Sequence, residues 1–282
     1  MKLKLGPEPP DSYLAKELED RVLVSVQRYG MCKDMRHSEQ LWFGLAHIGY
    51  DWDKDVLQIL IRSTAQEMGS WEELKCLAQT SQAMVFLTAR RGITLSEVQR
   101  GQIAAAVLAA ILSADDDILA LAADSLTLAA VKMGLPLSPE AVKRLHDCLA
   151  TMPLRQGRRR ITTTLANALY DIVRLGYQPT PAEAQQWQAR FVDGLPTEGS
   201  ANIRDATSWM LMALSSCRNY MPPPEVKAQL AALAEALPPN CDMGVATRTL
   251  AACKRWGVSL KPDVAQRLQR RQGKRGAAHV AR

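Results

Sequence analysis

The sequence predicts an all-α protein, a right-handed α-solenoid of about six helix-turn-helix repeats of about 38–43 residues. Two observations predict it. The segment LANALYDIVRLGYQPTPAE, residues 165–183, joins an amphipathic helix, a glycine stop and the start of a second helix. Equivalent stops follow five other apolar helices at nearly constant spacing. One such hairpin cannot bury its own apolar face, so we expect the copies to stack.

The helix stops share a residue type. Glycine adopts the left-handed conformation that ends a helix, and asparagine is the next best residue for it. The stops are Gly49, Gly92, Gly134, Gly176, Asn219 and Gly257. By subtraction, successive stops lie 43, 42, 42, 43 and 38 residues apart. An irregular helical bundle is the alternative fold, but it has no need of such even spacing.

The remaining elements follow along the chain. We expect residues 1–38 to be an N-terminal extension, in which a helix from Ser12 to about Tyr29 caps the array and the polar residues 31–38 link it to the first repeat. The repeat domain covers 39–272, and the apolar run 103–112 is one of its buried helices. The last helix is predicted to end near Gln272, and 273–282 to form a flexible basic tail. Second helices of the repeats are expected at 54–68, 139–152, 181–195 and 223–237.

Composition agrees with close-packed helices. Hydrophobic residues make up 47% of the chain and aromatic residues only 5%. No apolar segment reaches the roughly 18 residues that span a membrane. The six cysteines are scattered without a CxxC pair, so we expect buried free thiols rather than disulfides or zinc ligands. The N-terminus resembles neither a signal peptide nor an organellar transit peptide, so the chain either works where it is made or has lost a presequence.

The positive charge is concentrated at the C-terminus. The chain carries a net charge of +6. Residues 261–282 hold seven basic residues and one acid, so the preceding 260 residues are neutral overall. A basic tail on a neutral body is typical of a polyphosphate anchor, and a merely solubilising tail is the alternative. The loop 154–160, LRQGRRR, is a second basic cluster.

Comparison across the repeats predicts a row of basic side chains. Two residues before each stop lie His47, Arg90, Lys132, Arg174, Cys217 and Arg255. Seven residues earlier lie Gln40, Ala83, Ser125, Asn167, Met210 and Arg248. Residues seven apart share one face of a helix, so stacked repeats would align them as a ligand-facing stripe. The alternative at any one repeat is that a cation near a helix C-terminus simply offsets the helix dipole.

Catalytic motifs are missing from the sequence. None of the four histidines has a partner at metal-ligand spacing. His146 stands beside Asp147, but neighbours in a helix are expected to point apart. Residues 115–117, three aspartates, fit a helix start better than a divalent-ion site. Without a P-loop, GxGxxG or GxSxG, we expect no catalytic residue, metal or other cofactor.

The patterns LWxxLAxxGY at 41–50 and LxxALxxxxRLGYxP at 165–179 resemble the octotricopeptide repeat. The resemblance covers about 39–270 and is clearest in repeats one, three and four. Repeat two lacks the proline, repeat five has asparagine for glycine, and repeat six is short. Pentatricopeptide-like, armadillo-like and HEAT-like arrays are the alternatives.

The resemblance implies an RNA-binding protein of algal organelles. It favours an accessory subunit of the mitochondrial ribosome that holds fragmented ribosomal RNA beside neighbouring ribosomal proteins in the mitochondrial matrix. The alternatives are a transcript stability or translation factor, the chloroplast stroma, and a solenoid scaffold that binds proteins. We expect no membrane and no small-molecule substrate. The predicted RNA-binding residues are His47, Arg90, Lys132, Arg174, Arg255, Asn167, Gln40, Arg155, Arg158, Arg159, Arg160, Arg267, Arg270, Arg271, Lys274 and Arg275.

Overall fold

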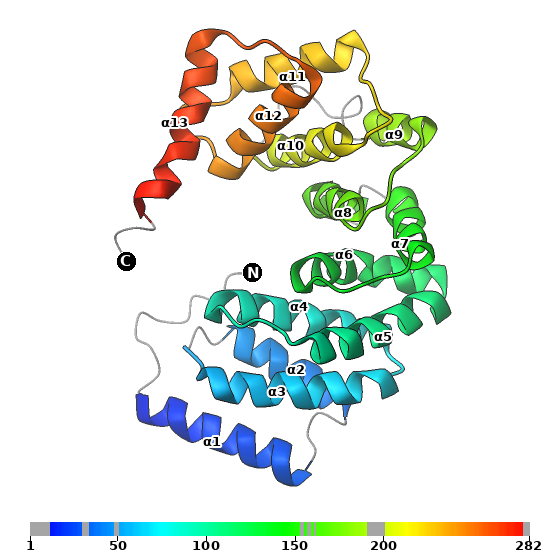
Figure 1. Ribbon diagram of the computed structural model, residues 1–282, viewed down its shortest axis with the longest axis vertical. Helices are drawn as coiled ribbons and strands as arrows, with labels where there is room; N and C mark the ends of the chain where they lie inside the picture. The colour runs from blue at the N-terminus through cyan, green and yellow to red at the C-terminus, as the bar shows by residue number, and fades with distance from the viewer. Residues whose placement is uncertain are drawn as a thin grey trace. The chain divides into compact units, whose positions relative to one another are not determined.

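The computed structural model is all-α, as the sequence predicts. It describes residues 12–29, 34–47, 51–152, 155–156, 159–160, 162–190 and 201–278. Thirteen α-helices, one short 3₁₀-helix and two two-residue strands make up this described part (Figure 1). None of its helices is long and apolar enough to cross a bilayer. The chain divides into two compact units, Met1–Cys148 and Leu149–Arg282, where the sequence predicts one continuous repeat domain over 39–272.

The first unit consists of two layers of helices. In one layer, α4 packs between α2 and α6, and in the other, α3 packs against α1 and α5 (Figure 1). The unit also contains the 3₁₀-helix η2 and most of α7. The helices are α1 (Ser12–Tyr29), α2 (Met35–His47), α3 (Lys54–Glu67), η2 (Met68–Ser70), α4 (Leu74–Arg91), α5 (Glu97–Ser113), α6 (Asp116–Met133) and α7 (Pro139–Thr151).

The second unit repeats this alternation. The helix α10 packs between α8 and α12, whereas α11 and α13 pack on α12 (Figure 1). The helices are α8 (Thr162–Arg174), α9 (Pro181–Gln188), α10 (Ala201–Ser216), α11 (Pro224–Ala236), α12 (Met243–Trp256) and α13 (Pro262–Ala278). The even-numbered helices α2 to α12 are the first helices of the predicted repeats, and we call them the first-layer helices.

Four of the six predicted stops have the expected left-handed conformation. These are Gly92, Gly134, Gly176 and Gly257, with φ between 62° and 98°. After each of them, the next backbone N–H reaches back five residues, as Ile93 N does to the Thr88 carbonyl at 2.9 Å. This bond defines the Schellman motif, which satisfies the carbonyls at the end of the helix. Gly49 lies outside the described residues.

The prediction for Asn219 is wrong. No non-glycine residue of the described part has a positive φ. The helix α10 ends instead at Ser216, and Cys217 N donates to the Leu214 carbonyl at 3.1 Å. The Cys217 thiol also donates to the Ala213 carbonyl at 3.2 Å. A tightened last turn and a thiol therefore satisfy the carbonyls that a left-handed residue would otherwise satisfy.

Several predicted boundaries shift. The helix α2 begins at Met35, so the expected linker 31–38 is partly helical. The last helix continues to Ala278, past both Gly273 and Gly276, and not merely to Gln272. The expected loop 154–160 contains a short antiparallel ladder that pairs Arg155 with Arg160.

Arginines of the second layer tie neighbouring helices together. Arg144 on α7 donates to the carbonyls of Ile111 and Leu112 at 2.7 and 2.6 Å, at the end of α5. Arg190 donates to the Met152 carbonyl just after α7, and Arg267 donates to the Glu235 carbonyl of α11 at 2.9 Å. A guanidinium at a helix C-terminus both satisfies free carbonyls and offsets the helix dipole. The same tie thus recurs at three places in the fold.

Candidate nucleic-acid interface

The predicted basic row is exposed on the first unit. His47 on α2, Arg90 on α4 and Lys132 on α6 each lie in the last turn of a first-layer helix, and all three side chains are solvent-exposed. The His47 ring stacks on Phe43, with ring centroids 3.9 Å apart. Because α4 packs between α2 and α6, the three residues stand on adjacent helices.

The second unit carries cations at two of its three equivalent positions. Arg174 on α8 and Arg255 on α12 are exposed. Arg174 donates to the buried Asp171 carboxylate at 3.2 Å, and Arg255 donates to the Ser216 hydroxyl. Between them, Cys217 is buried, and burial raises its thiol pKa to about 12. The chain therefore offers no cation at this position at the end of α10.

The second predicted row does not share this exposed face throughout. Gln40 is exposed and Asn167 is half-buried, but Ala83 and Met210 are buried in the core. The sequence reasoning is wrong there because α4 and α10 each pack between two neighbours, which leaves only a narrow strip of each helix in solvent. Ser125 is half-buried too, and its hydroxyl donates to Gln82 at 3.3 Å.

The C-terminal basic residues divide into two groups. Arg267 is half-buried and donates to the carbonyls of Ala234 and Glu235 at the end of α11, so its RNA-binding role stays a prediction for a guanidinium that the fold already engages. Arg270 is exposed. Arg271, Lys274 and Arg275 follow on α13, beyond the residues whose side chains the structure describes.

The basic loop is described only in its backbone. Arg155 lies on β1 and both Arg159 and Arg160 lie on β2, whereas Arg158 lies outside the described residues. The positions of these side chains remain predictions.

A pocket that the sequence analysis missed lies among α8, α10 and α12. It has a volume of about 490 Å³ and is lined by Tyr170, Trp209, Met212, Met243, Gly244, Thr247 and Arg248. The Trp209 and Tyr170 rings stand 5.5 Å apart, and the Arg248 guanidinium lies 3.9 Å from the Trp209 ring centroid. Such close contact is a cation–π interaction. The sequence offered no signal for this pocket, because its lining comes from three helices that lie far apart along the chain.

Acceptors hold the pocket arginine in place. Arg248 donates to the Asp205 carboxylate and, at 3.0 Å, to the Ser208 hydroxyl. Burial raises the pKa of Asp205 and lowers that of Arg248, while the attraction between the two charges opposes both shifts. Gly244 leaves room for the guanidinium, because a Cβ at this position would stand 2.8 Å from Arg248 Nη1. The result is a fixed cation beside two aromatic rings.

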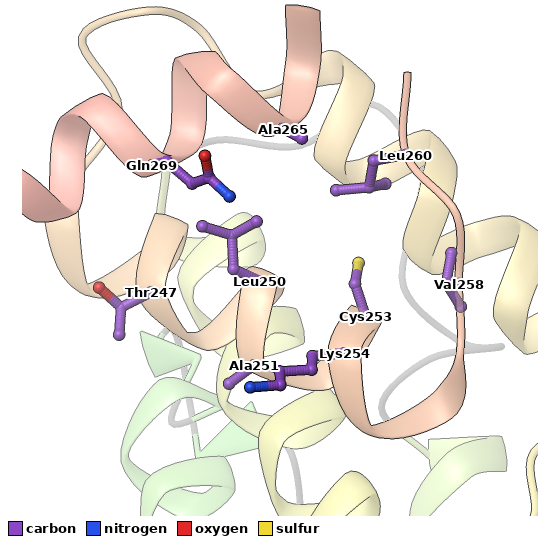
Figure 2. Close-up of a pocket in the computed structure, with 9 residues that line it drawn as sticks. All are labelled: Thr247, Leu250, Ala251, Cys253, Lys254, Val258, Leu260, Ala265 and Gln269. Carbon is purple, nitrogen blue, oxygen red and sulfur yellow. The ribbon is translucent and has the colours of Figure 1, made fainter. Parts of the chain in front are cut away.

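A second hollow lies between α12 and α13 (Figure 2). Its volume is about 440 Å³, and its lining includes Leu250, Cys253, Leu260 and Ala265. Burial raises the pKa of the Cys253 thiol to about 11. The mainly aliphatic lining offers apolar contact rather than phosphate binding.

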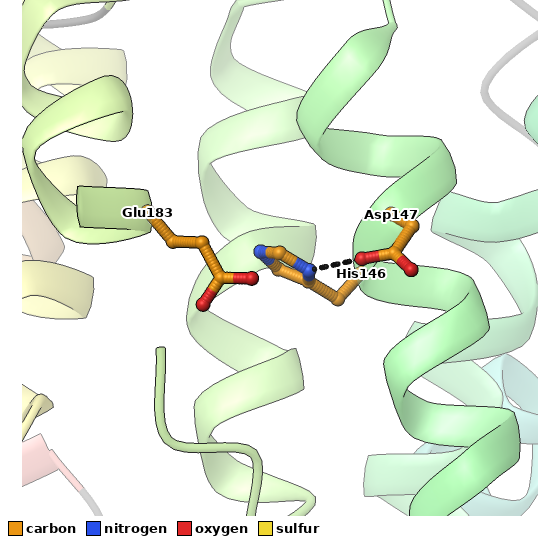
Figure 3. A group of neighbouring side chains, drawn as sticks. All are labelled: His146, Asp147 and Glu183. Carbon is orange, nitrogen blue, oxygen red and sulfur yellow. Dashed lines mark hydrogen bonds and ion pairs between the residues drawn. The ribbon is translucent and has the colours of Figure 1, made fainter. Parts of the chain in front are cut away.

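His146 interacts with the residue that follows it in the chain, Asp147. His146 is buried on α7, and its Nδ1 lies 2.9 Å from an Asp147 carboxylate oxygen (Figure 3). The two neighbours therefore interact, which corrects the expectation that they point apart. Burial acts to raise the pKa of Asp147, but hydrogen bonds from Lys143 and His146 lower it. Glu183, drawn in the same view, belongs to the second unit, where it completes the capping box of α9 with Thr180.

The described cysteines fit the prediction of free thiols. Cys76, Cys148, Cys217, Cys241 and Cys253 are buried, and none of these five forms a disulfide. Cys32 lies outside the described residues.

Comparisons with protein-family models, with curated proteins and with solved structures found no match to this chain. The candidate interface therefore has to be interpreted from its own chemistry.

Proposed function

We propose that the protein is a non-catalytic RNA-binding helical repeat protein, built as a right-handed α-solenoid of about six octotricopeptide-like repeats. One observation carries the proposal. The same place in the last turn of the first-layer helices α4, α6, α8 and α12 holds an exposed cation: Arg90, Lys132, Arg174 and Arg255. Exposed cations that recur at equivalent positions of the first-layer helices suit a polyanion.

The binding mechanism divides the work between two kinds of side chain. The exposed cations contact phosphates, which supply affinity without sequence information. Polar groups such as Gln40 and Asn167 reach base edges of unpaired nucleotides. The pocket around Trp209 adds aromatic surface beside the fixed charge of Arg248. Arg270, Arg271, Lys274 and Arg275, near the end of α13, extend the electrostatic attraction.

The proposed setting is the mitochondrial matrix, where the chain would act as a ribosome accessory subunit that stabilises fragmented ribosomal RNA beside neighbouring ribosomal proteins. The resemblance of residues 41–50 and 165–179 to octotricopeptide repeats and the basic C-terminus support this. A transcript stability or translation factor and a location in the chloroplast stroma are the alternatives that the same features support.

The aliphatic hollow between α12 and α13 favours a second candidate function, that of a protein-binding scaffold (Figure 2). Leu250 and Leu260 supply apolar surface there. Both functions fit a ribonucleoprotein, in which one protein contacts RNA and protein together.

The test compares charge-neutralised variants of the full chain. Arg90→Gln and Lys132→Gln together should weaken binding to single-stranded RNA and lower the salt slope, log affinity against log salt, by about 1.4, since each phosphate contact contributes about 0.7. Arg62→Gln is the control, because Arg62 is exposed on the second-layer helix α3. The role of the row would be contradicted if Arg62→Gln lowered RNA affinity by as much per substitution as the double variant does. It would also be contradicted if neither protein lost affinity.

A further inference from the structure

Two phenylalanines of the first unit are exposed on neighbouring first-layer helices. Phe43 on α2 is 55% exposed and Phe86 on α4 is 54% exposed. Neither belongs to the core of the described residues. A single exposed apolar side chain needs no explanation, but two aromatic rings exposed on adjacent helices are a candidate binding surface.

Each phenylalanine stands one helical turn before a residue of the basic row. Phe43 precedes His47 by four residues, and Phe86 precedes Arg90 by four. Side chains four residues apart are neighbours on a helix surface. The His47 and Phe43 rings are such neighbours, because they stack with their centroids 3.9 Å apart. The pattern recurs in the second unit, where the Arg174 guanidinium lies 6.0 Å from the ring centroid of Tyr170.

The helices α2 and α4 pack against each other, so the two phenylalanines stand on adjacent first-layer helices. Packed helices lie about 8–10 Å apart. Stacked nucleotides of one strand rise only about 3.4 Å each. The distance between the helices therefore corresponds to about two to three nucleotides of one strand, so a single strand can reach both rings. The bases that contact the rings must be unpaired, because a duplex keeps the faces of its bases covered.

We infer that Phe43 and Phe86 are stacking platforms for unpaired bases of single-stranded RNA, with His47 and Arg90 beside the adjoining phosphates. This inference rests on the proposed RNA-binding function and specifies its substrate class. Stacking on aromatic rings tolerates any base, because every base has a π-face. The platforms thus select strandedness rather than sequence.

The surroundings of the rings favour RNA over an apolar protein partner. On its own helix, Phe86 is flanked at one turn by Gln82, Ala89 and Arg90, all exposed. A protein hot spot needs contiguous apolar surface around its aromatic anchor, whereas a stacked base needs one ring face with polar groups and a cation around it. On α2 the equivalent neighbours are polar or small, although Glu39 adds one acid there.

The experiment measures affinity of the full chain for an unstructured single-stranded RNA and for duplex RNA of equal length, at several salt concentrations. Phe43→Ala and Phe86→Ala should each lower affinity for the single strand roughly 5- to 150-fold, the range for loss of one base–aromatic stack. The salt slope should stay unchanged, because no phosphate contact is lost. Phe86→Trp should retain binding, since the larger ring also stacks.

Val98→Ala is the matched control, because Val98 is 71% exposed on the second-layer helix α5. Circular dichroism confirms that each variant is folded. If the wild-type chain binds single-stranded RNA and both alanine variants bind it equally well, the stacking inference is wrong and the proposed function stands. Equal losses on duplex and single strand would also overturn it. If the wild-type chain binds no RNA at low salt, both the inference and the proposed function fail.

Discussion

Replacing Arg248 by methionine should destabilise the second unit, because the substitution leaves a carboxylate without its counterion. The Arg248 side chain is 11% exposed, and the Asp205 side chain that it contacts is 33% exposed. Breaking a buried ion pair by removing one partner costs about 3–5 kcal/mol. Partial exposure of Asp205 reduces this penalty, and methionine keeps some contact with Trp209. We therefore expect a loss of about 2–3 kcal/mol at pH 7.

The cost should depend on pH. Burial already raises the pKa of Asp205, and Arg248 opposes that rise. Without the arginine, the pKa in the folded state should rise further. A carboxyl whose folded pKa exceeds its unfolded value favours folding below the unfolded pKa, and this contribution is lost as pH rises through the folded pKa. The penalty should thus be largest near pH 7 and shrink as pH falls toward the ordinary aspartate pKa of about 3.9.

Urea unfolding monitored by circular dichroism at pH 7 and at lower pH measures both effects. Arg255→Met on the same helix is the control, because Arg255 is exposed, and its cost should stay within about 0.5 kcal/mol. Adding Asp205→Asn to Arg248→Met should recover part of the loss, because the amide carries no charge to leave unpaired. A penalty for Arg248→Met that is absent at pH 7, or the same at every pH, would refute the reasoning.

Three further predictions concern the fold. Arg144→Gln should cost about 1–3 kcal/mol, because the carbonyls at the end of α5 lose a charged donor; thermal unfolding checks this, and an unchanged midpoint would contradict it. Gly134→Ala should lower the free energy of unfolding by about 1–2 kcal/mol, because φ of Gly134 is +64°. Asn219→Gly should bring no gain in stability, since Asn219 is not left-handed. Urea midpoints measure both, and a gain for Asn219→Gly or no loss for Gly134→Ala would contradict these assignments. Cys217 and Cys253, with pKa values raised to about 12 and 11 by burial, should resist alkylation at pH 8 until urea unfolds the chain, and rapid labelling of the native protein would count against their burial.

The helices and their ends were largely predictable because local chemistry decides them. Gly92, Gly134, Gly176 and Gly257 have the conformation that the residue type and spacing predict. The prediction of a left-handed stop at Asn219 was wrong because the Cys217 thiol, two residues earlier, donates to the Ala213 carbonyl at the end of the helix. The helix α13 continues past Gly273 because glycine in a helix is unfavourable by only about 1 kcal/mol and does not stop it.

The candidate interface was predictable only in part. The spacing of the stops located the exposed residues Arg90, Lys132 and Arg255, because these residues share one position relative to the helix end. The contacts of Arg267 with α11 and the pocket around Trp209 depend on residues that lie 32 to 43 positions apart. Tertiary packing decides such contacts, and no local pattern reports them.

The most direct test of the account is the affinity of the unmodified full chain for single-stranded RNA as a function of salt. Four exposed cations of the basic row, each with a phosphate contact worth about 0.7 in slope, predict that log affinity falls against log salt with a slope of about −3 or steeper. A chain that binds no RNA at low salt, or binds it with no dependence on salt, would contradict the claim that this basic row is an RNA interface.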